Sequence, residues 1–301
     1  EQTSGTYSGI GALVSQNAET GIITVVKAFA DAPAAKAGVK NGDIIYKVKG
    51  KEVTGVDINN VVTEMKGEKG TTVDITVYRE SEKKYIDFTI TRDQVNEPTV
   101  EYKMLDKKKK IGYIQISQFE EVTYDQFTKA LDDLKKQGMK AVIFDVRSNP
   151  GGLYETVCKM LDEILPEGNL VSTKDKYGNE EKQTSDSKCL DMPMVVLQNK
   201  DSASASEIFA GAIQDFNAGK IVGTQSFGKG IVQTILPLSD GSAVKLTVQD
   251  YYTPSGKNIH GKGITPDVEA ELEENATSDT QLEKAKETIM EIMNRKTVHI
   301  S

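Results

Sequence analysis

The chain has 301 residues, of which 38% are apolar and 27% are charged, so it is long enough for one large domain or two of modest size. This composition excludes a disordered chain, a collagen and a coiled coil. Its 45 acidic and 37 basic residues give a formal net charge of −8, which offers no general attraction to nucleic acid or to anionic lipid.

Targeting segments and metal motifs are both missing from the sequence. No stretch approaches the roughly 20 consecutive apolar residues of a spanning helix, and Glu1–Gly5 lack the charged and apolar regions of a signal peptide. We therefore expect a soluble chain, with membrane association only through segments that it does not contain. Cys158 and Cys189 form no C-x-x-C pair, and without an H-E-x-x-H motif we expect no metal and no cofactor.

The first part of the chain is predicted to be a small, mostly β domain over residues 7–95, after a six-residue remnant of an N-terminal region at 1–6. Two short helices interrupt its strands, and Asp57 can cap the second helix. The expected strands are 21–26, 43–48, 73–78 and 85–90, and the expected helices are 33–38 and 57–65. Asn96 begins a boundary that ends this domain.

Residues 96–301 follow a different pattern, in which buried strands alternate with amphipathic helices. This alternation predicts a parallel or mixed sheet flanked by helices, so the fold class is α/β. The expected strands are 112–116, 141–146, 194–197 and 220–223, and the expected helices are 125–137, 154–165, 203–218 and 279–294. Residues 231–236 and 242–248 are expected to form a hairpin attached to this layer.

A candidate nucleophile lies in the serine-rich segment 202–207, Ser-Ala-Ser-Ala-Ser-Glu, between a strand and a helix. A hydroxyl here would stand at the carboxyl edge of the sheet beside the free amides of a helix start. The same serines could instead cap the helix and pack against neighbours.

A serine needs a base, and lysine is the candidate because this half of the core holds no histidine before His260. Lys229 lies between Gly228 and Gly230 ahead of an apolar strand, where burial would lower its pKa and let it accept a proton. Alternatively, Lys229 is an exposed lysine in a surface turn.

Two other motifs overlap this lysine. Residues 223–230 nearly match a phosphate-binding loop, but Gly230 replaces the required hydroxyl and a strand follows, so we discount nucleotide binding. Ser226 and Lys229 also fit S-x-x-K, which keeps Ser226 as a rival nucleophile.

Asn149-Pro-Gly-Gly, after a buried strand, could supply oxyanion-binding amides or form an ordinary turn.

Together these motifs resemble those of the carboxyl-terminal processing peptidases, or tail-specific proteases, which are serine endopeptidases with a PDZ domain, a Ser/Lys dyad and a crotonase-like core. Tyr252-Thr-Pro-Ser-Gly and Gly263-Ile-Thr-Pro-Asp match later signatures of that family. The resemblance covers the chain from Tyr7 onward.

The resemblance implies specific roles. The family spacing of 25 positions pairs Lys229, as base, with Ser204 as nucleophile, and Gln233 as the residue that orients the lysine. The implied oxyanion donors are the backbone N–H groups of Gly152 and Ala205. The implied activity is endopeptidase cleavage at or near C-terminal tails, outside the cytoplasm in a periplasmic, cell-surface or secreted setting; a homo-oligomer or an activator protein is left open.

The N-terminal domain resembles a PDZ domain. Its carboxylate-binding loop would be Gly9, Ile10, Gly11 and Ala12, and its ligand the free, apolar C-terminus of a protein or peptide added as a strand. The family often has arginine where this chain has Lys66, which cannot reproduce a bidentate contact. A catalytically silent peptide-binding scaffold is the competing reading, and Ser226 or His260 could replace members of the dyad.

Overall fold

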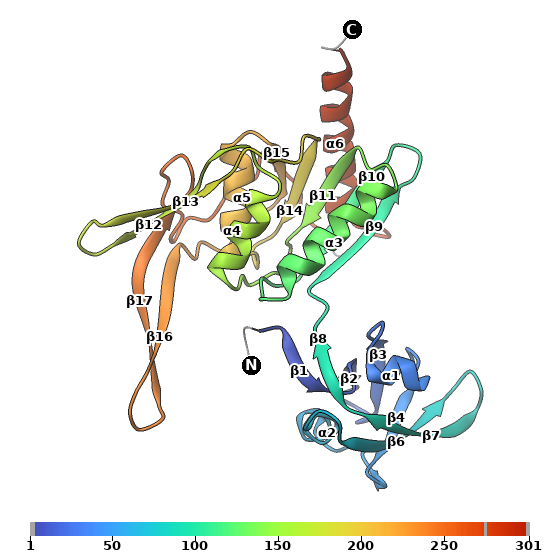
Figure 1. Ribbon diagram of the computed structural model, residues 1–301. Coiled ribbons are helices and arrows are strands. Elements are labelled where there is room, and N and C mark those ends of the chain that lie inside the picture. Colours follow the sequence, from blue (N-terminus) through green and yellow to red (C-terminus); the bar gives the residue numbers. More distant parts are fainter. Residues whose placement is uncertain (1–3, 274–275, 299–301) are drawn as a thin grey trace. The chain divides into compact units, whose positions relative to one another are not determined.

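The computed structural model describes residues 4–273 and 276–298, which form two compact units, Glu1–Pro98 and Thr99–Ser301 (Figure 1). Each unit has its own hydrophobic core. None of the described helices is long and apolar enough to cross a membrane.

The first unit is built on an antiparallel sheet of order β2-β3-β4-β6-β7, with β5 paired to β4 and a separate β1-β8 ribbon. All four predicted strands and both predicted helices are present, and Asp57 caps α2 by accepting the Asn59 N–H at 2.9 Å. The elements are β1 (Thr6–Gly9), β2 (Ala12–Gln16), β3 (Ile23–Ala28), α1 (Pro33–Ala37), β4 (Ile44–Val48), β5 (Lys51–Glu52), α2 (Ile58–Met65), β6 (Thr72–Arg79), β7 (Lys84–Thr91) and β8 (Asp93–Asn96).

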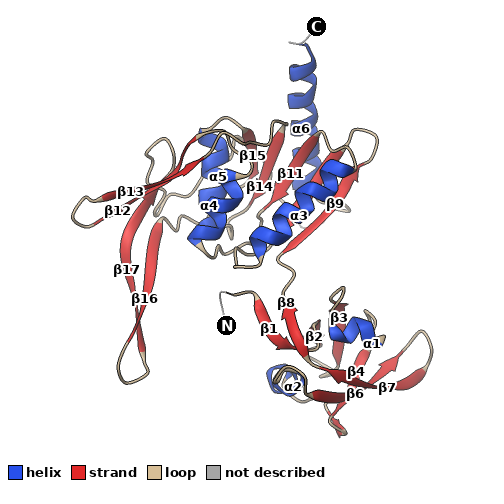
Figure 2. Cartoon of the chain, in the orientation of Figure 1, coloured by secondary structure: helices blue, strands red, loops and turns tan. Residues whose placement is uncertain are grey.

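The second unit contains a six-stranded sheet of order β18-β15-β14-β11-β10-β9, parallel except for β9 (Figure 2). Helices α3, α4 and α5 pack on one face and α6 on the other, which confirms the predicted α/β class. These elements are β9 (Val100–Asp106), β10 (Ile111–Ile116), α3 (Thr123–Lys136), β11 (Ala141–Asp145), α4 (Tyr154–Asp162), β14 (Met194–Gln198), α5 (Ala205–Asp215), β15 (Gly219–Gly223), β18 (Val268–Glu269) and α6 (Thr280–Val298).

The predicted hairpin is present but belongs to a second, antiparallel sheet of order β13-β12-β17-β16. Its strands are β12 (Gly168–Asp175), β13 (Glu180–Ser185), β16 (Ile231–Pro237) and β17 (Ala243–Tyr252). The sequence did not predict β12 and β13, because β13 is mostly polar and lacks an apolar stripe. Two helices are also shorter than predicted: α5 begins at Ala205 and α4 ends at Asp162.

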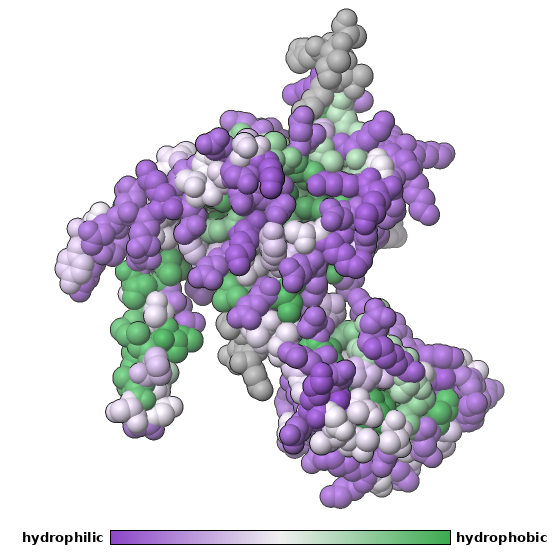
Figure 3. Space-filling model, viewed as in Figure 1, coloured by the Kyte–Doolittle hydropathy of each residue, from purple (hydrophilic) through white to green (hydrophobic). Residues whose placement is uncertain are grey.

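The β16–β17 hairpin projects from the core and exposes one apolar face, visible as the green arm in Figure 3. Cross-strand pairing puts Leu236 opposite Val244, and alternation adds Leu246 to the same face. Lys245 and Thr247 lie on the other face, together with the exposed Ile235, which pairs with Lys245. The base of this hairpin, not its apolar arm, reaches the site described next.

Candidate active site

Three neighbouring strands of the central sheet send their carboxyl ends into one region. Strands β11, β14 and β15 are adjacent, and the segments that follow them contain Gly152, Ser204 and Lys229 respectively. Parallel strands bring such segments together at one edge. The predicted site residues of this unit therefore converge from positions far apart in the sequence.

Ser204 occupies a strained turn at the start of α5. Its φ of 56° and ψ of −115° are unusual for a residue with a side chain. It lines a cavity of about 360 Å³ together with Gly152, Ala205, Gln233 and Tyr251. Ala205 is the first residue of α5, so its N–H has no partner within the helix and can serve as a donor in the cavity.

The two neighbouring serines have structural partners instead. The Ser202 hydroxyl donates to the Val146 carbonyl at 2.8 Å, and the Ser206 hydroxyl donates to the Asn149 carbonyl at 2.9 Å. Both serines are buried. Of the three serines, Ser204 is therefore the one in the cavity, while the other two fasten the helix start to the glycine loop.

That glycine loop is held rigidly. The buried Asn149 side chain donates to the Ile116 carbonyl and accepts the Gly151 N–H. Gly152 lies so close to Phe119 that a Cβ would stand 2.1 Å from the Phe119 carbonyl oxygen, and its φ is +144°. Only glycine fits this position, which leads directly into the cavity.

Glu207 joins the serine turn to the lysine loop. Its carboxylate is fully buried; Oε2 accepts the backbone N–H groups of Ser204 and Lys229, each at 2.8 Å. Oε1 accepts the Ser226 hydroxyl at 2.6 Å and the Gly228 N–H at 2.7 Å. Ser204 and Lys229 are thus hydrogen-bonded to one oxygen atom.

Tyr251 makes a second link between the same two residues. Its hydroxyl lies 3.0 Å from the Ser204 carbonyl oxygen and also contacts the Lys229 carbonyl oxygen. Burial, with the negative charge of Glu207, raises the pKa of Tyr251 well above its ordinary value, so the hydroxyl remains a donor. Sequence analysis missed both residues, although Ser204-x-x-Glu207 is a capping-box pattern that could have indicated the glutamate.

The Lys229 backbone is hydrogen-bonded to Glu207 and Tyr251, whereas its side chain makes no comparable contact with the site in the described chain. Lys229 is half-buried and forms no ion pair within the described ranges 4–273 and 276–298. It is not among the residues that line the Ser204 cavity, and no side-chain hydrogen bond joins it to Ser204 in the described chain.

Gln233 lines the Ser204 cavity from strand β16, which does not include Lys229. Alternation along one regular strand would return Gln233, four positions on, to the face of Lys229, but β16 begins only at Ile231. The pairing of β16 with β17 also skips Val248, which is the extra residue of a bulge on β17 beside Gln233. The Gln233 amide donates to Thr247 Oγ1 at 3.5 Å.

The rival residues are engaged elsewhere. Ser226 is buried, donates to Glu207 and accepts the Ile264 N–H at 2.6 Å, so its hydroxyl cannot act as a nucleophile without breaking both bonds. His260 is an exposed loop residue that does not line the Ser204 cavity. Its backbone packs against Gly230, where a Cβ would be 2.6 Å from the His260 nitrogen.

The predicted carboxylate-binding loop joins β1 to β2 in the first unit and faces α2. Ile10, Gly11 and Ala12 line a cavity of about 40 Å³ there, and Gly9 precedes it. The carbonyl oxygens of Ile10 and Gly11 accept the N–H groups of Ala34 and Phe29 at 2.7 and 3.0 Å, so both are engaged within the unit.

Tyr7 and Lys66 close this groove. Burial, with a contribution from the charge of Glu97, raises the pKa of Tyr7 to about 12, while contact with the Ala12 amide opposes the rise. The Lys66 ammonium lies 4.9 Å from the centre of the Tyr7 ring. The tyrosine therefore stands at the backbone of Ala12, one of the residues of the predicted carboxylate-binding loop.

Comparisons with known proteins match both units. A model of peptidase family S41 matches residues 110–270, and a PDZ domain model matches residues 8–90. A carboxy-terminal-processing protease of Bartonella bacilliformis is 41% identical over 279 residues, which cover 90% of this chain and 63% of that protein. A CtpA-like serine protease of Staphylococcus epidermidis is 40% identical over 272 residues and 54% of its own length. The chain thus spans about half to two thirds of these relatives.

Comparison with solved structures also finds proteases of this kind. The photosystem II D1 C-terminal processing protease aligns with 91% of this chain and 75% of its own, at 30% identity and a TM-score of 0.54. An S41 protease of Bacteroides fragilis aligns with 100% of this chain and 85% of its own, at a TM-score of 0.60 but 16% identity, which supports the fold alone.

Proposed function

This chain belongs to peptidase family S41, as the sequence resemblance predicted, and on that premise we propose that it is a serine endopeptidase that captures proteins by their free C-termini and cleaves them near that end. The observation that carries the proposal is the shared Glu207 oxygen, which holds the Lys229 backbone close to that of Ser204, and Ser204 lines a cavity together with Gly152 and Ala205. The family resemblance supports an extracytoplasmic site of action.

In the proposed mechanism, Lys229 Nζ accepts the proton of the Ser204 hydroxyl as Oγ attacks a peptide carbonyl. The N–H groups of Gly152 and Ala205 donate to the oxyanion that forms. When the intermediate collapses, the C–N bond breaks and Lys229 returns the proton to the leaving amine. A water molecule, deprotonated by Lys229, then hydrolyses the acyl-enzyme. Gln233, from the cavity wall, would orient the lysine.

The nucleophile can be identified by covalent labelling. We expect a serine-directed fluorophosphonate to modify Ser204, because the other nearby hydroxyls are committed to buried hydrogen bonds. Mass spectrometry of the digested protein would locate the label, with Ser204→Ala as the unlabelled control. Labelling at Ser226 would overturn the dyad, and absence of labelling combined with binding of free tails would favour the silent scaffold.

Recognition of the C-terminus can be tested with a loosely folded protein that ends in an apolar tail. If backbone amides in the loop Gly9–Ala12 bind the carboxylate, amidating the tail should slow cleavage about tenfold, since a charge-assisted hydrogen bond is lost. Cleavage rates of the free and amidated forms provide the measurement. Equal rates would show that the carboxylate is not recognised.

Tyr7 should limit the affinity of the PDZ groove. A ligand has to displace the Tyr7 hydroxyl from the Ala12 backbone, so Tyr7→Ala is expected to tighten binding of a labelled apolar tail about three- to tenfold. Fluorescence anisotropy would measure the Kd. Tyr46→Ala is the matched control, because Tyr46 is remote from this loop and bonds to Glu52. Unchanged or weaker binding by Tyr7→Ala would contradict this role.

A further inference from the structure

A second cavity adjoins the one that contains Ser204. It has a volume of about 440 Å³ and lies between helix α4 and the sheet that contains β12, β13, β16 and β17. Tyr154, Glu155 and Val232 line both cavities, so the two share a wall. A polypeptide bound across Ser204 would therefore pass the opening of this second cavity.

The charged groups around this cavity are mainly acidic. Its lining includes three carboxylates, from Glu155, Asp162 and Glu181, against the single ammonium of Lys159. Asp162 accepts the Asp186 N–H at 2.7 Å. In the described part of the chain, Glu155 and Glu181 take part in no ion pair. Two carboxylates are thus available to a ligand.

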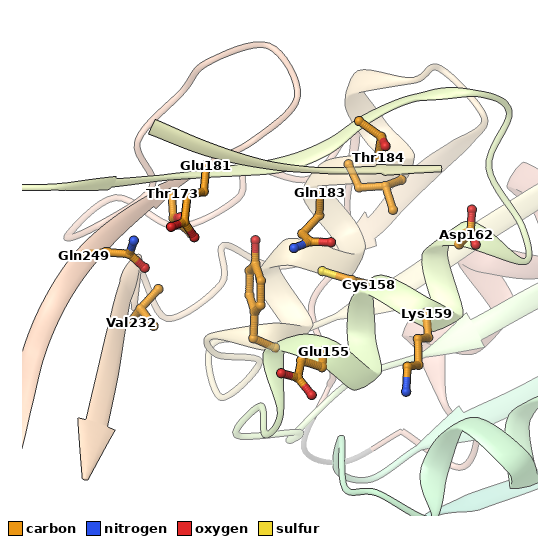
Figure 4. A pocket seen from close by; sticks show the side chains of 12 residues that line it. Glu155, Cys158, Lys159, Asp162, Thr173, Glu181, Gln183, Thr184, Val232 and Gln249 are labelled. Atoms are coloured by element: carbon orange, nitrogen blue, oxygen red, sulfur yellow. The ribbon is translucent and has the colours of Figure 1, made fainter. Parts of the chain in front are cut away.

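The remaining walls are suited to an amphipathic side chain. Leu170 and Val232 are apolar, while Gln183 and Gln249 provide amides. Figure 4 shows Glu181 and Gln183 extending from β13 toward helix α4, which presents Cys158 and Glu155 from the other side. Lysine and arginine combine an apolar stem with a cationic head, and both parts would find partners here.

The thiol in the wall does not change this balance of charge. Burial raises the pKa of Cys158 to about 12, so the thiol is neutral at physiological pH. Tyr154 is likewise kept protonated, because burial raises its pKa and the nearby thiol and Glu181 act in the same direction. The carboxylates therefore set the sign of the potential in the cavity.

Resting on the function proposed above, we propose that this second cavity is a substrate subsite that selects a lysine or arginine side chain near the scissile bond. In an extended chain, alternate side chains point to the same face. The selected residue should therefore lie two positions from the one that occupies the Ser204 cavity. Glu181 and Glu155 act as specificity-determining residues.

The test uses fluorescence-quenched peptides with amidated C-termini, so that capture of a free carboxylate by the PDZ domain plays no part. The peptides differ only in carrying lysine, glutamine or glutamate at one position, scanned from three residues before to three residues after the cleaved bond. We expect lysine to be favoured over glutamate about tenfold in kcat/KM at one position, and less so at high salt. Glu181→Lys should reverse that preference.

Glu180→Lys is the matched control, because it makes the same charge change one residue away. Glu180 pairs with Lys174 and does not line the cavity. We expect it to retain the wild-type preference. Equal effects of Glu180→Lys and Glu181→Lys, or no charge preference at any scanned position, would overturn the subsite.

Binding separates this proposal from the proposed function. Affinities of the same peptides for the Ser204→Ala variant should show the same preference for lysine without any turnover. If the wild-type protein cleaves nothing yet binds lysine peptides selectively, the peptidase assignment fails and the subsite stands. If it cleaves all peptides at rates independent of charge, the subsite fails and the peptidase assignment stands.

Discussion

Replacing Glu207 with glutamine is expected to lower kcat about a thousandfold and to destabilise the second unit by about 2 to 5 kcal/mol. The carboxylate accepts four donors, two on each oxygen, and it holds both the Ser204 turn and the Lys229 loop. A glutamine amide keeps one oxygen but turns an NH₂ group toward two of those donors. The two backbones would then separate, and a displacement of about 1 Å is enough to disrupt proton transfer.

This result would be measured as kcat on a neutral peptide and as the free energy of unfolding in urea. Glu163→Gln makes the same chemical change at an exposed carboxylate that accepts from Tyr124, and it should alter neither quantity appreciably. Because destabilisation alone could reduce the folded fraction, kcat is compared at a temperature at which both variants remain folded. A Glu207→Gln variant with wild-type kcat would show that the four hydrogen bonds do not position the dyad.

Replacing Gly152 with alanine is expected to lower kcat about 10²- to 10³-fold, the usual effect of losing one oxyanion donor. The new Cβ would stand 2.1 Å from the Phe119 carbonyl oxygen, which already accepts the Leu153 N–H at 2.6 Å. Both atoms are backbone, so the loop has to move and take the Gly152 N–H with it. Steady-state kinetics on one neutral peptide would measure the effect, which should fall on kcat more than on KM.

Gly178→Ala supplies the control for backbone strain. Gly178 also has a positive φ, +88°, but a Cβ there would have no atom within 4 Å. Its replacement should cost about 1 kcal/mol of stability and leave kcat unchanged. If Gly152→Ala behaves in the same way, the amide of Gly152 is not an oxyanion donor.

Local patterns were sufficient for most of the architecture. Asp57 was predicted as a cap from its side chain and position, and the Asp57–Asn59 hydrogen bond confirms it. The alternating strands and helices after residue 96 likewise predicted the covered sheet. Predictions failed where tertiary contacts override periodicity: the polar strand β13 is stabilised by pairing with β12, and the bulge at Val248 follows from the pairing of β17 with β16.

By itself, the sequence determined the fold class and the family, because caps, periodicity and motif order are properties of neighbouring residues. It could not distinguish among the serines at 202, 204 and 206 without the family spacing. That distinction depends on hydrogen-bond partners about 56 positions away, Val146 and Asn149, which engage Ser202 and Ser206. Only the tertiary structure shows Glu207 as the link between Ser204 and Lys229 and places an acidic cavity beside them, since both depend on segments that meet only after the sheet has formed.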